Sequence, residues 1–311
     1  MATVEDDEGG AVLMTRPKKK SGPDHALEKF ALATVAKKID GLRAEFATLK
    51  TFVPKVTSQA AFNRNMDCNR YNNVICYDHT RVVLKFNVPP DRDYIHANYV
   101  RTSLCNLPNN FICTQGPMDS TVNDFWRLVW QEKPKTIVML CKVIECGKQK
   151  CSQYFPLNRG ETKQYGMVFE SIEMNVSVRG NSAVVVTLFK WLDWPDFGVP
   201  TSGMGMLRIL RQIRDQPQST AIIHCSAGIG RTGTIVACEI CLKILLEGKD
   251  LNVLDVIKEI RAQRAGAVQT EGQYVYLHRT LCEYINAKKI AKEKIAEFFT
   301  AYLSYASSCK G

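Results

Sequence analysis

The 311-residue sequence contains no apolar run that approaches the roughly 20 residues of a membrane-spanning helix. Residues 1–20 are acidic and then basic, without the apolar core of a secretory signal, so we expect a cytoplasmic protein. The sequence has no internal repeat, no zinc-finger spacing and no aromatic RNA-binding motif, which argues against nucleic acid as a partner. Without a secretory signal, the twelve cysteines are expected to be reduced thiols.

Positive charge, in contrast, is in excess. The net charge of +10 suits acidic partners such as phosphopeptides, and the basic segments near both ends leave contact with an anionic membrane surface as an open alternative. Cys238 and Cys241 form a C-x-x-C in an apolar helical run without a second pair nearby. We interpret them as core residues, and we expect no metal site and no cofactor.

Composition divides the chain into four parts. Residues 1–24 are polar and charged and are expected to be disordered. Residues 25–50 form an amphipathic helix, residues 51–286 the main domain, and residues 287–311 a basic helical tail. Apolar residues recur every three or four positions along the first helix, at Leu32, Val35, Ile39, Leu42, Phe46 and Leu49. We expect this stripe to dock on the main domain, with a partner helix as the alternative.

The sequence pattern predicts strands in the middle of the chain and helices in its last third. Ile172, Met174, Val176 and Val178 alternate with polar residues, which predicts a half-buried strand. Residues 136–140 and 183–189 are continuous apolar runs, typical of strands covered on both faces. Helices are predicted over 232–246, 252–261 and from Tyr274 towards Tyr305. The fold class is therefore α+β, a mixed, highly twisted sheet with helices on both sides.

Residues 224–233 read His-Cys-Ser-Ala-Gly-Ile-Gly-Arg-Thr-Gly, between an apolar strand and a helix. The free N–H groups of such a loop and of the first helical turn form an anion site. Arg231 adds a planar fork that suits phosphate oxygens, and a thiol at Cys225 would ionise readily in this field. The pattern favours attack of cysteine on a phosphoryl group. Sulfur transfer, arsenate reduction and a turn that binds nothing stay open on the loop alone.

The chain resembles the cysteine-dependent, tyrosine-specific protein phosphatases over roughly residues 40–286. The motifs that carry the resemblance occur in family order: Asn69-Arg70-Tyr71, Tyr77-Asp78-His79-Thr80-Arg81-Val82, Asp93-Tyr94-Ile95-His96-Ala97-Asn98-Tyr99, Thr114-Gln115-Gly116-Pro117, Asp124-Phe125-Trp126, Lys150-Cys151, Gln153-Tyr154-Phe155-Pro156, Trp194-Pro195-Asp196-Phe197-Gly198-Val199-Pro200, the cysteine loop, Gln269-Thr270 and Gln273-Tyr274. The resemblance implies the tyrosine phosphatase fold and the hydrolysis of phosphotyrosine in proteins, without a metal.

The same resemblance implies a set of catalytic groups. Cys225 is the nucleophile and Arg231 binds the phosphoryl oxygens. Phenolate needs a proton as it leaves, since its conjugate acid has a pKa of about 10, and Asp196 is the implied donor. Gln269 positions the attacking water, Thr232 donates to the sulfur, and His224 helps to keep the thiolate ionised.

Other positions are implied to bind and orient the substrate. Tyr71 forms a wall of a deep pocket that excludes phosphoserine. Glu145 orients Arg231, and Lys150 contacts the segment of the general acid. The remaining substrate-binding positions are Ser226, Ala227, Gly228, Ile229, Gly230, Asn73 and Gln273.

Three positions depart from the family pattern. Asn73 replaces an aspartate that holds the substrate backbone, His96 replaces an asparagine, and Phe155 replaces a tryptophan. Two rival functions remain: a pseudophosphatase that binds phosphotyrosine without turnover, as an adaptor would, and a dual-specificity phosphatase. The retained Cys225, Arg231 and Asp196 argue against the first. Tyr71 and the segment with Gln269 and Gln273 argue against the second.

Overall fold

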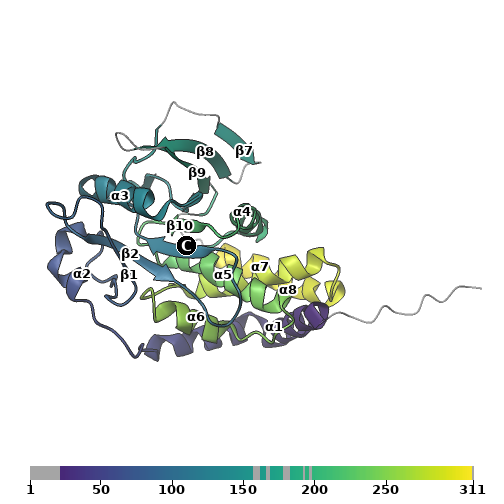
Figure 1. Ribbon diagram of the computed structural model, residues 1–311. Coiled ribbons are helices and arrows are strands. Elements are labelled where there is room, and N and C mark those ends of the chain that lie inside the picture. Colours follow the sequence, from purple (N-terminus) through teal and green to yellow (C-terminus); the bar gives the residue numbers. More distant parts are fainter. Residues whose placement is uncertain are drawn as a thin grey trace, which may run out of the picture.

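A mixed β-sheet of eight strands runs through the computed structural model and has helices on both faces (Figure 1). The structure describes residues 22–156, 162–165, 169–177, 183–191, 193–195 and 198–309. The α-helices are α1 (Gly22–Ala47), α2 (Ala60–Arg64), α3 (Val122–Glu132), α4 (Met204–Arg214), α5 (Gly230–Leu246), α6 (Val253–Arg261), α7 (Glu271–Ala287) and α8 (Lys292–Ser308). The strands are β1 (Arg81–Val83), β2 (Tyr94–Val100), β3 (Asn110–Thr114), β4 (Thr136–Met139), β5 (Ile144–Glu145), β6 (Lys148–Gln149), β7 (Thr162–Tyr165), β8 (Phe169–Val176), β9 (Val184–Trp191) and β10 (Thr220–His224).

The strand order places the end of β10 at the centre of the molecule. The order is β1-β2-β3-β10-β4-β9-β8-β7, while β5 and β6 form a separate hairpin. β10 is parallel to both β3 and β4, and the outer pairs β1–β2 and β7–β8 are antiparallel. The predicted α+β class with a mixed sheet is confirmed.

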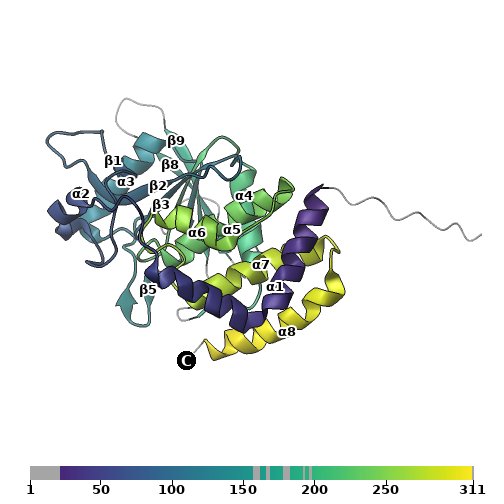
Figure 2. The same ribbon diagram turned by 90° about the horizontal axis from the view of Figure 1, so that it is seen from below.

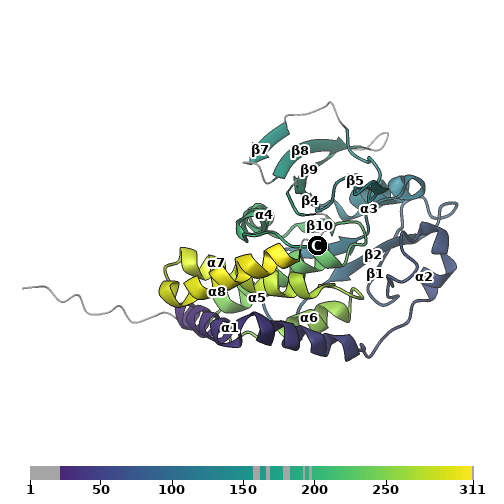
Figure 3. The ribbon, with the colours of Figure 1, turned by 180° about the vertical axis from the view of Figure 1, so that it is seen from behind.

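Side chains of β10 alternate between two cores. Ala221 and Ile223 pack with residues of α1 and α4–α8, whereas Ile222 packs on the other face with residues of α3. Figures 2 and 3 show α1 and α5–α8 gathered on one side of the sheet. Burial on both faces explains why the central strands are continuous apolar runs rather than alternating ones.

The N-terminal helix docks on the domain, as its apolar stripe predicts. Phe30 stacks on His278 of α7 with ring centroids 5.4 Å apart, and Thr34 Oγ1 lies 3.2 Å from His278 Nδ1. The helix is kinked at Lys38, whose φ is +54°. The kink changes which side faces the domain, so the predicted stripe is buried at Leu42, Phe46 and Leu49 but only partly at Leu32 and Val35.

The single helix expected from Tyr274 towards Tyr305 is wrong, since α7 and α8 are separate. Lys289 and Ala291 adopt left-handed backbone with φ of +62° and +48°, and Ile290 N–H donates to Ile285 O. Such an end normally carries glycine, and no glycine marks it here. α8 then turns back along α7 and α1 (Figure 2).

Residues 287–311, expected as a basic helical tail, contain α8, which buries one face on the domain. Ile295, Phe298, Tyr302 and Ala306 of α8 are buried, while Lys288, Lys289, Lys292 and Lys294 are exposed as predicted. The expected disorder of residues 1–24 falls mostly outside the described residues, as does Val178 of the predicted strand. Within the described chain, no helix has both the length and the apolar character to span a bilayer.

Candidate active site

Cys225 lies in the loop between the end of β10 and the start of α5. The Gly228 N–H donates to Cys225 Sγ at 3.2 Å, so the loop backbone already faces the sulfur. Gly228 has a φ of +70°, and a Cβ there would lie 2.0 Å from the carbonyl oxygen of Thr114. Only glycine fits this position without displacing β3. The loop conformation is therefore fixed by its contact with the neighbouring strand.

Arg231, in the first turn of α5, is held by Glu145 of the β5–β6 hairpin. Its Nη1 and Nη2 donate to the two carboxylate oxygens of Glu145 at 2.6 and 3.1 Å. They also donate to Leu140 O at 2.7 Å and Pro195 O at 3.2 Å. Burial opposes the charged guanidinium, but the hydrogen bond and charge of Glu145 outweigh it and raise the pKa of Arg231. The guanidinium is thus a fixed, permanent positive charge.

His224, the last residue of β10, contacts both the cysteine loop and Tyr154. Its Nδ1 lies 3.1 Å from Cys225 O, which can only accept, so Nδ1 carries a proton. Its Nε2 lies 2.7 Å from the hydroxyl of Tyr154, a contact that the sequence does not reveal. Thr232 Oγ1 is buried and makes no hydrogen bond within the described residues. The bond to the sulfur that the resemblance implies is therefore not formed in this structure.

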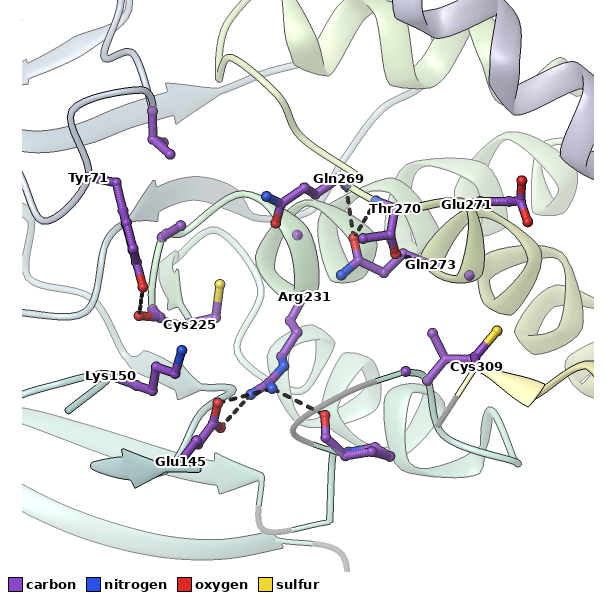
Figure 4. Close-up of a pocket in the computed structure, with 18 of the residues that line it drawn as sticks. Tyr71, Glu145, Lys150, Cys225, Arg231, Gln269, Thr270, Glu271, Gln273 and Cys309 are labelled. Carbon is purple, nitrogen blue, oxygen red and sulfur yellow. Dashed lines mark hydrogen bonds and ion pairs between the residues drawn. The ribbon is translucent and has the colours of Figure 1, made fainter. Parts of the chain in front are cut away.

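The predicted binding residues meet at one hollow of about 710 Å³ (Figure 4). The predicted residues that line it are Tyr71, Asn73, Glu145, Lys150, Cys225, Ser226, Ala227, Gly230, Arg231, Gln269 and Gln273. Gly228, Ile229, Thr232 and His224 are buried behind this lining. Asp196 lies outside the described residues, and its neighbours Pro195 and Gly198 line the hollow.

Two lining residues have additional structural contacts. The hydroxyl of Tyr71 lies 2.8 Å from Ser226 Oγ, which ties the predicted pocket wall to the cysteine loop. Gln273 Oε1 accepts from the backbone N–H groups of Gln269 at 2.8 Å and Thr270 at 3.2 Å. Gln273 thus caps α7 and fixes the main chain that carries Gln269.

Sequence reasoning missed Arg264, which is fully buried behind the loop. Its Nε donates to Gly228 O and its Nη2 to Ala227 O, both at 3.0 Å. The bond to Ala227 O holds the peptide whose N–H, that of Gly228, donates to the sulfur. An arginine just after an amphipathic helix gives no sequence signal, because such a residue is normally solvated. Tyr305 and Cys309 near the C-terminus also line the hollow, and nothing in the sequence predicted them there.

His96, one of the departures from the family pattern, contacts Arg264 directly. Its Nδ1 accepts from Arg264 Nη1 at 3.1 Å, and its Nε2 donates to Val74 O at 2.7 Å. Burial, together with the charge of Arg264, lowers the pKa of His96 to about 3. A proton on Nδ1 would face a guanidinium and break this contact.

His96→Asn should make the fold less sensitive to acid. Because its folded pKa of about 3 is below the unfolded value of about 6.5, His96 contributes stability above pH 6.5 that is lost as the pH falls. At pH 5 this lowers the free energy of unfolding by about 2 kcal/mol. In urea unfolding, the free energy of unfolding should decrease less between pH 7 and pH 5 for the variant than for the wild type.

His79→Asn, at an exposed histidine, is the matched control and should behave as the wild type does. His278, whose pKa burial also lowers to about 3, contributes equally in all three proteins and cancels. An equal loss of stability in the wild type and His96→Asn would contradict the assignment.

Comparison with known proteins agrees with this geometry. The family model described as protein-tyrosine phosphatase matches residues 65–283, more than half of the chain. Human receptor-type tyrosine-protein phosphatase alpha is 36% identical over 265 residues, covering 78% of this chain and 32% of its own length. Human receptor-type tyrosine-protein phosphatase zeta is 35% identical over 286 residues, covering 80% of this chain and 12% of its own length.

The chain thus spans a third or less of these two curated relatives. Among solved structures, the catalytic domain of human protein tyrosine phosphatase non-receptor type 18 superposes with a TM-score of 0.72 at 32% identity. The match covers 85% of this chain and all of that domain. Because the family model covers more than half of the chain and these relatives are more than 30% identical over most of it, the chain belongs to the protein-tyrosine phosphatase family.

Proposed function

We propose that this protein hydrolyses phosphotyrosine in proteins, through a cysteinyl-phosphate intermediate. The observation that carries the proposal is that Cys225, whose Sγ accepts from the Gly228 N–H, and Arg231 line the same hollow. A thiolate there lies beside the loop N–H of Gly228 and the positive charge of Arg231, which can stabilise the charge on the equatorial phosphoryl oxygens. Membership of the family supports the same reaction class.

The reaction proceeds in two displacements at phosphorus. In the first, the Cys225 thiolate forms the S–P bond, the bond to the tyrosine oxygen breaks, and Asp196 protonates that oxygen. In the second, water positioned by Gln269 gives a proton to Asp196 and attacks phosphorus. The S–P bond breaks, phosphate leaves, and Thr232 donates to the departing sulfur. The roles of Asp196, Gln269 and Thr232 rest on the family resemblance.

Tyr71 is the proposed basis of selectivity. Its hydroxyl is fixed to Ser226 of the loop, so the ring stands as a wall beside the nucleophile. In the deep pocket that the family resemblance implies, such a wall admits the long phosphotyrosine side chain to Cys225 and leaves phosphoserine short of it. Lys150 and Asn73 line the same hollow and are the proposed contacts for the rest of the peptide.

Phosphotyrosine-containing signalling proteins are the proposed partners, in the cytoplasm. Ten of the twelve cysteines are buried, and within the described residues none of these ten forms a disulfide, which supports a reducing compartment. The exposed lysines at the junction of α7 and α8 support the weaker proposal of contact with anionic lipid surfaces.

A phosphotyrosine peptide and a phosphoserine peptide of the same sequence test the proposal. In EDTA, the wild type should turn over the first at least about a hundredfold faster. Tyr71→Ala should lower the ratio of phosphotyrosine to phosphoserine turnover about tenfold. Tyr71→Phe keeps the ring and loses only the bond to Ser226, so it should preserve most of this ratio. Binding without turnover would indicate a pseudophosphatase, and equal rates a dual-specificity enzyme.

A further inference from the structure

Residues 71–74 form a turn that supplies one wall of the active-site hollow and that we call the recognition turn. Tyr71, Asn73 and Val74 line the hollow, and the Val74 N–H donates to Tyr71 O at 3.3 Å. The recognition turn contacts the cysteine loop directly, because the Tyr71 hydroxyl lies 2.8 Å from Ser226 Oγ (Figure 4). A wall that selects side chains by their length has to stay at a fixed distance from the nucleophile.

His96 of β2 makes a second, buried connection between the recognition turn and the cysteine loop. Its Nε2 donates to Val74 O at 2.7 Å, and its Nδ1 accepts from Arg264 Nη1 at 3.1 Å. Arg264 in turn donates to the main chain of the cysteine loop, at Gly228 O and Ala227 O. One neutral imidazole therefore presents a donor to the recognition turn and an acceptor to the arginine that holds the cysteine loop.

The recognition turn has few other supports. Within the described part of the chain, the bond from His96 is the one hydrogen bond that joins the main chain of residues 71–75 to a different segment. Just before the turn, the Arg70 N–H donates to Gln115 Oε1 at 2.9 Å. His96 itself is 1% exposed and belongs to a strand paired on both sides. Its ring thus reaches from a fixed strand to a turn that depends on it.

We propose that His96 is a positioning residue that couples the recognition turn to the cysteine loop and so fixes the distance between the Tyr71 wall and Cys225. The inference rests on the proposed function and deepens it, since this coupling would set how strictly the hollow selects phosphotyrosine. An imidazole ring carries its two nitrogens at fixed positions, so one side chain can hold both partners at once. The asparagine of the family pattern offers one amide on a shorter side chain.

Two substitutions separate the two contacts of the ring. In His96→Asn, the amide oxygen is as many bonds from the Cα as Nδ1 is, so it can still accept from Arg264, but no group reaches Val74 O. In His96→Gln, the amide nitrogen is as many bonds from the Cα as Nε2 is, so it can still donate to Val74 O. Arg264 Nη1 then keeps only Asn98 Oδ1, at 2.8 Å. Each variant removes one half of the coupling.

The two variants should affect different kinetic constants at pH 7. His96→Asn should raise the KM of a phosphotyrosine peptide about three- to tenfold and change kcat less than about twofold, because the wall loosens while the cysteine loop stays in place. It should also lower the ratio of phosphotyrosine to phosphoserine turnover at least about threefold. His96→Gln should lower kcat about three- to tenfold and change KM less than about twofold, because only the support of the cysteine loop is weakened.

His79→Asn is the matched control. The exposed His79 also has its Nε2 against a main-chain carbonyl, 3.0 Å from Ala262 O, and it lies outside the lining of the hollow. This variant should keep KM and kcat within about twofold of the wild type. The same pattern of changes in His96→Asn and His96→Gln, or an unchanged KM in His96→Asn, would overturn the coupling and leave His96 as core packing.

Amide hydrogen exchange gives a readout that needs no turnover. In His96→Asn, exchange should accelerate about three- to tenfold in residues 71–76 and stay unchanged in residues 226–229, and His96→Gln should show the opposite pattern. Acceleration of both segments, or of neither, would also overturn the coupling. A wild type without turnover whose variants still show these two patterns would reject the proposed function and retain the coupling by His96.

Discussion

Cys225→Ser should lower the turnover of a phosphotyrosine peptide by more than about a thousandfold and leave the peptide bound. The Gly228 N–H and the Arg231 guanidinium remain in place to bind the phosphate. The serine hydroxyl, however, stays protonated near pH 7, so the nucleophile is lost while the anion site survives. Rates and peptide binding by calorimetry, measured on the same preparation, separate the two effects.

Cys146→Ser is the control for this substitution, because Cys146 is an exposed cysteine outside the lining of the hollow. It should keep full activity. Turnover by Cys225→Ser above about one part in a thousand of the wild-type rate would remove Cys225 from the chemistry.

Arg231→Lys should lower kcat/KM by at least about a hundredfold. Arg231 uses both of its terminal nitrogens on Glu145, which fixes the plane of the guanidinium beside the hollow. Lysine keeps the charge but has a single ammonium, so it cannot be held by the carboxylate and also face two phosphate oxygens. The loss should appear with peptides and small aryl phosphates alike, because both present the same phosphoryl group.

Arg214→Lys offers a matched comparison. Arg214 makes the same kind of two-point contact with buried Glu239, at 2.8 and 2.6 Å, away from the lining of the hollow. Both variants should unfold at somewhat lower temperature, but Arg214→Lys should keep its activity within about twofold. A comparable loss of activity in both would attribute the effect of Arg231→Lys to stability.

The cysteine loop could be predicted from the sequence because the strand, the turn and the helix that form it are contiguous. Strand, glycine turn and helix start occupy residues 220–232, and the Gly228 N–H and Cys225 Sγ that it contacts are only three positions apart. Periodicity likewise located β8, β9 and α6 to within a few residues. Local patterns suffice where local backbone decides the structure.

Features that depend on contacts between distant residues were not readable. Arg264 supports Ala227 and Gly228 across 37 and 36 positions, and only the fold brings them together. The kink at Lys38 and the break at Lys289 use left-handed backbone without glycine, so no residue type announces them. The same holds for the end of α8 at the hollow.

The central place of β10 has a consequence for the order in which the molecule is made. β3 and β4 are synthesised about a hundred residues before β10, and they can be joined only by pairing on both edges of that strand. A nascent or truncated chain that ends before Thr220 would leave two apolar strand edges open, which invites association with other chains. The nucleophile directly follows the strand that closes this gap. A product that stops before this strand would therefore lack the nucleophile as well as the completed sheet, and would be both inactive and prone to aggregate.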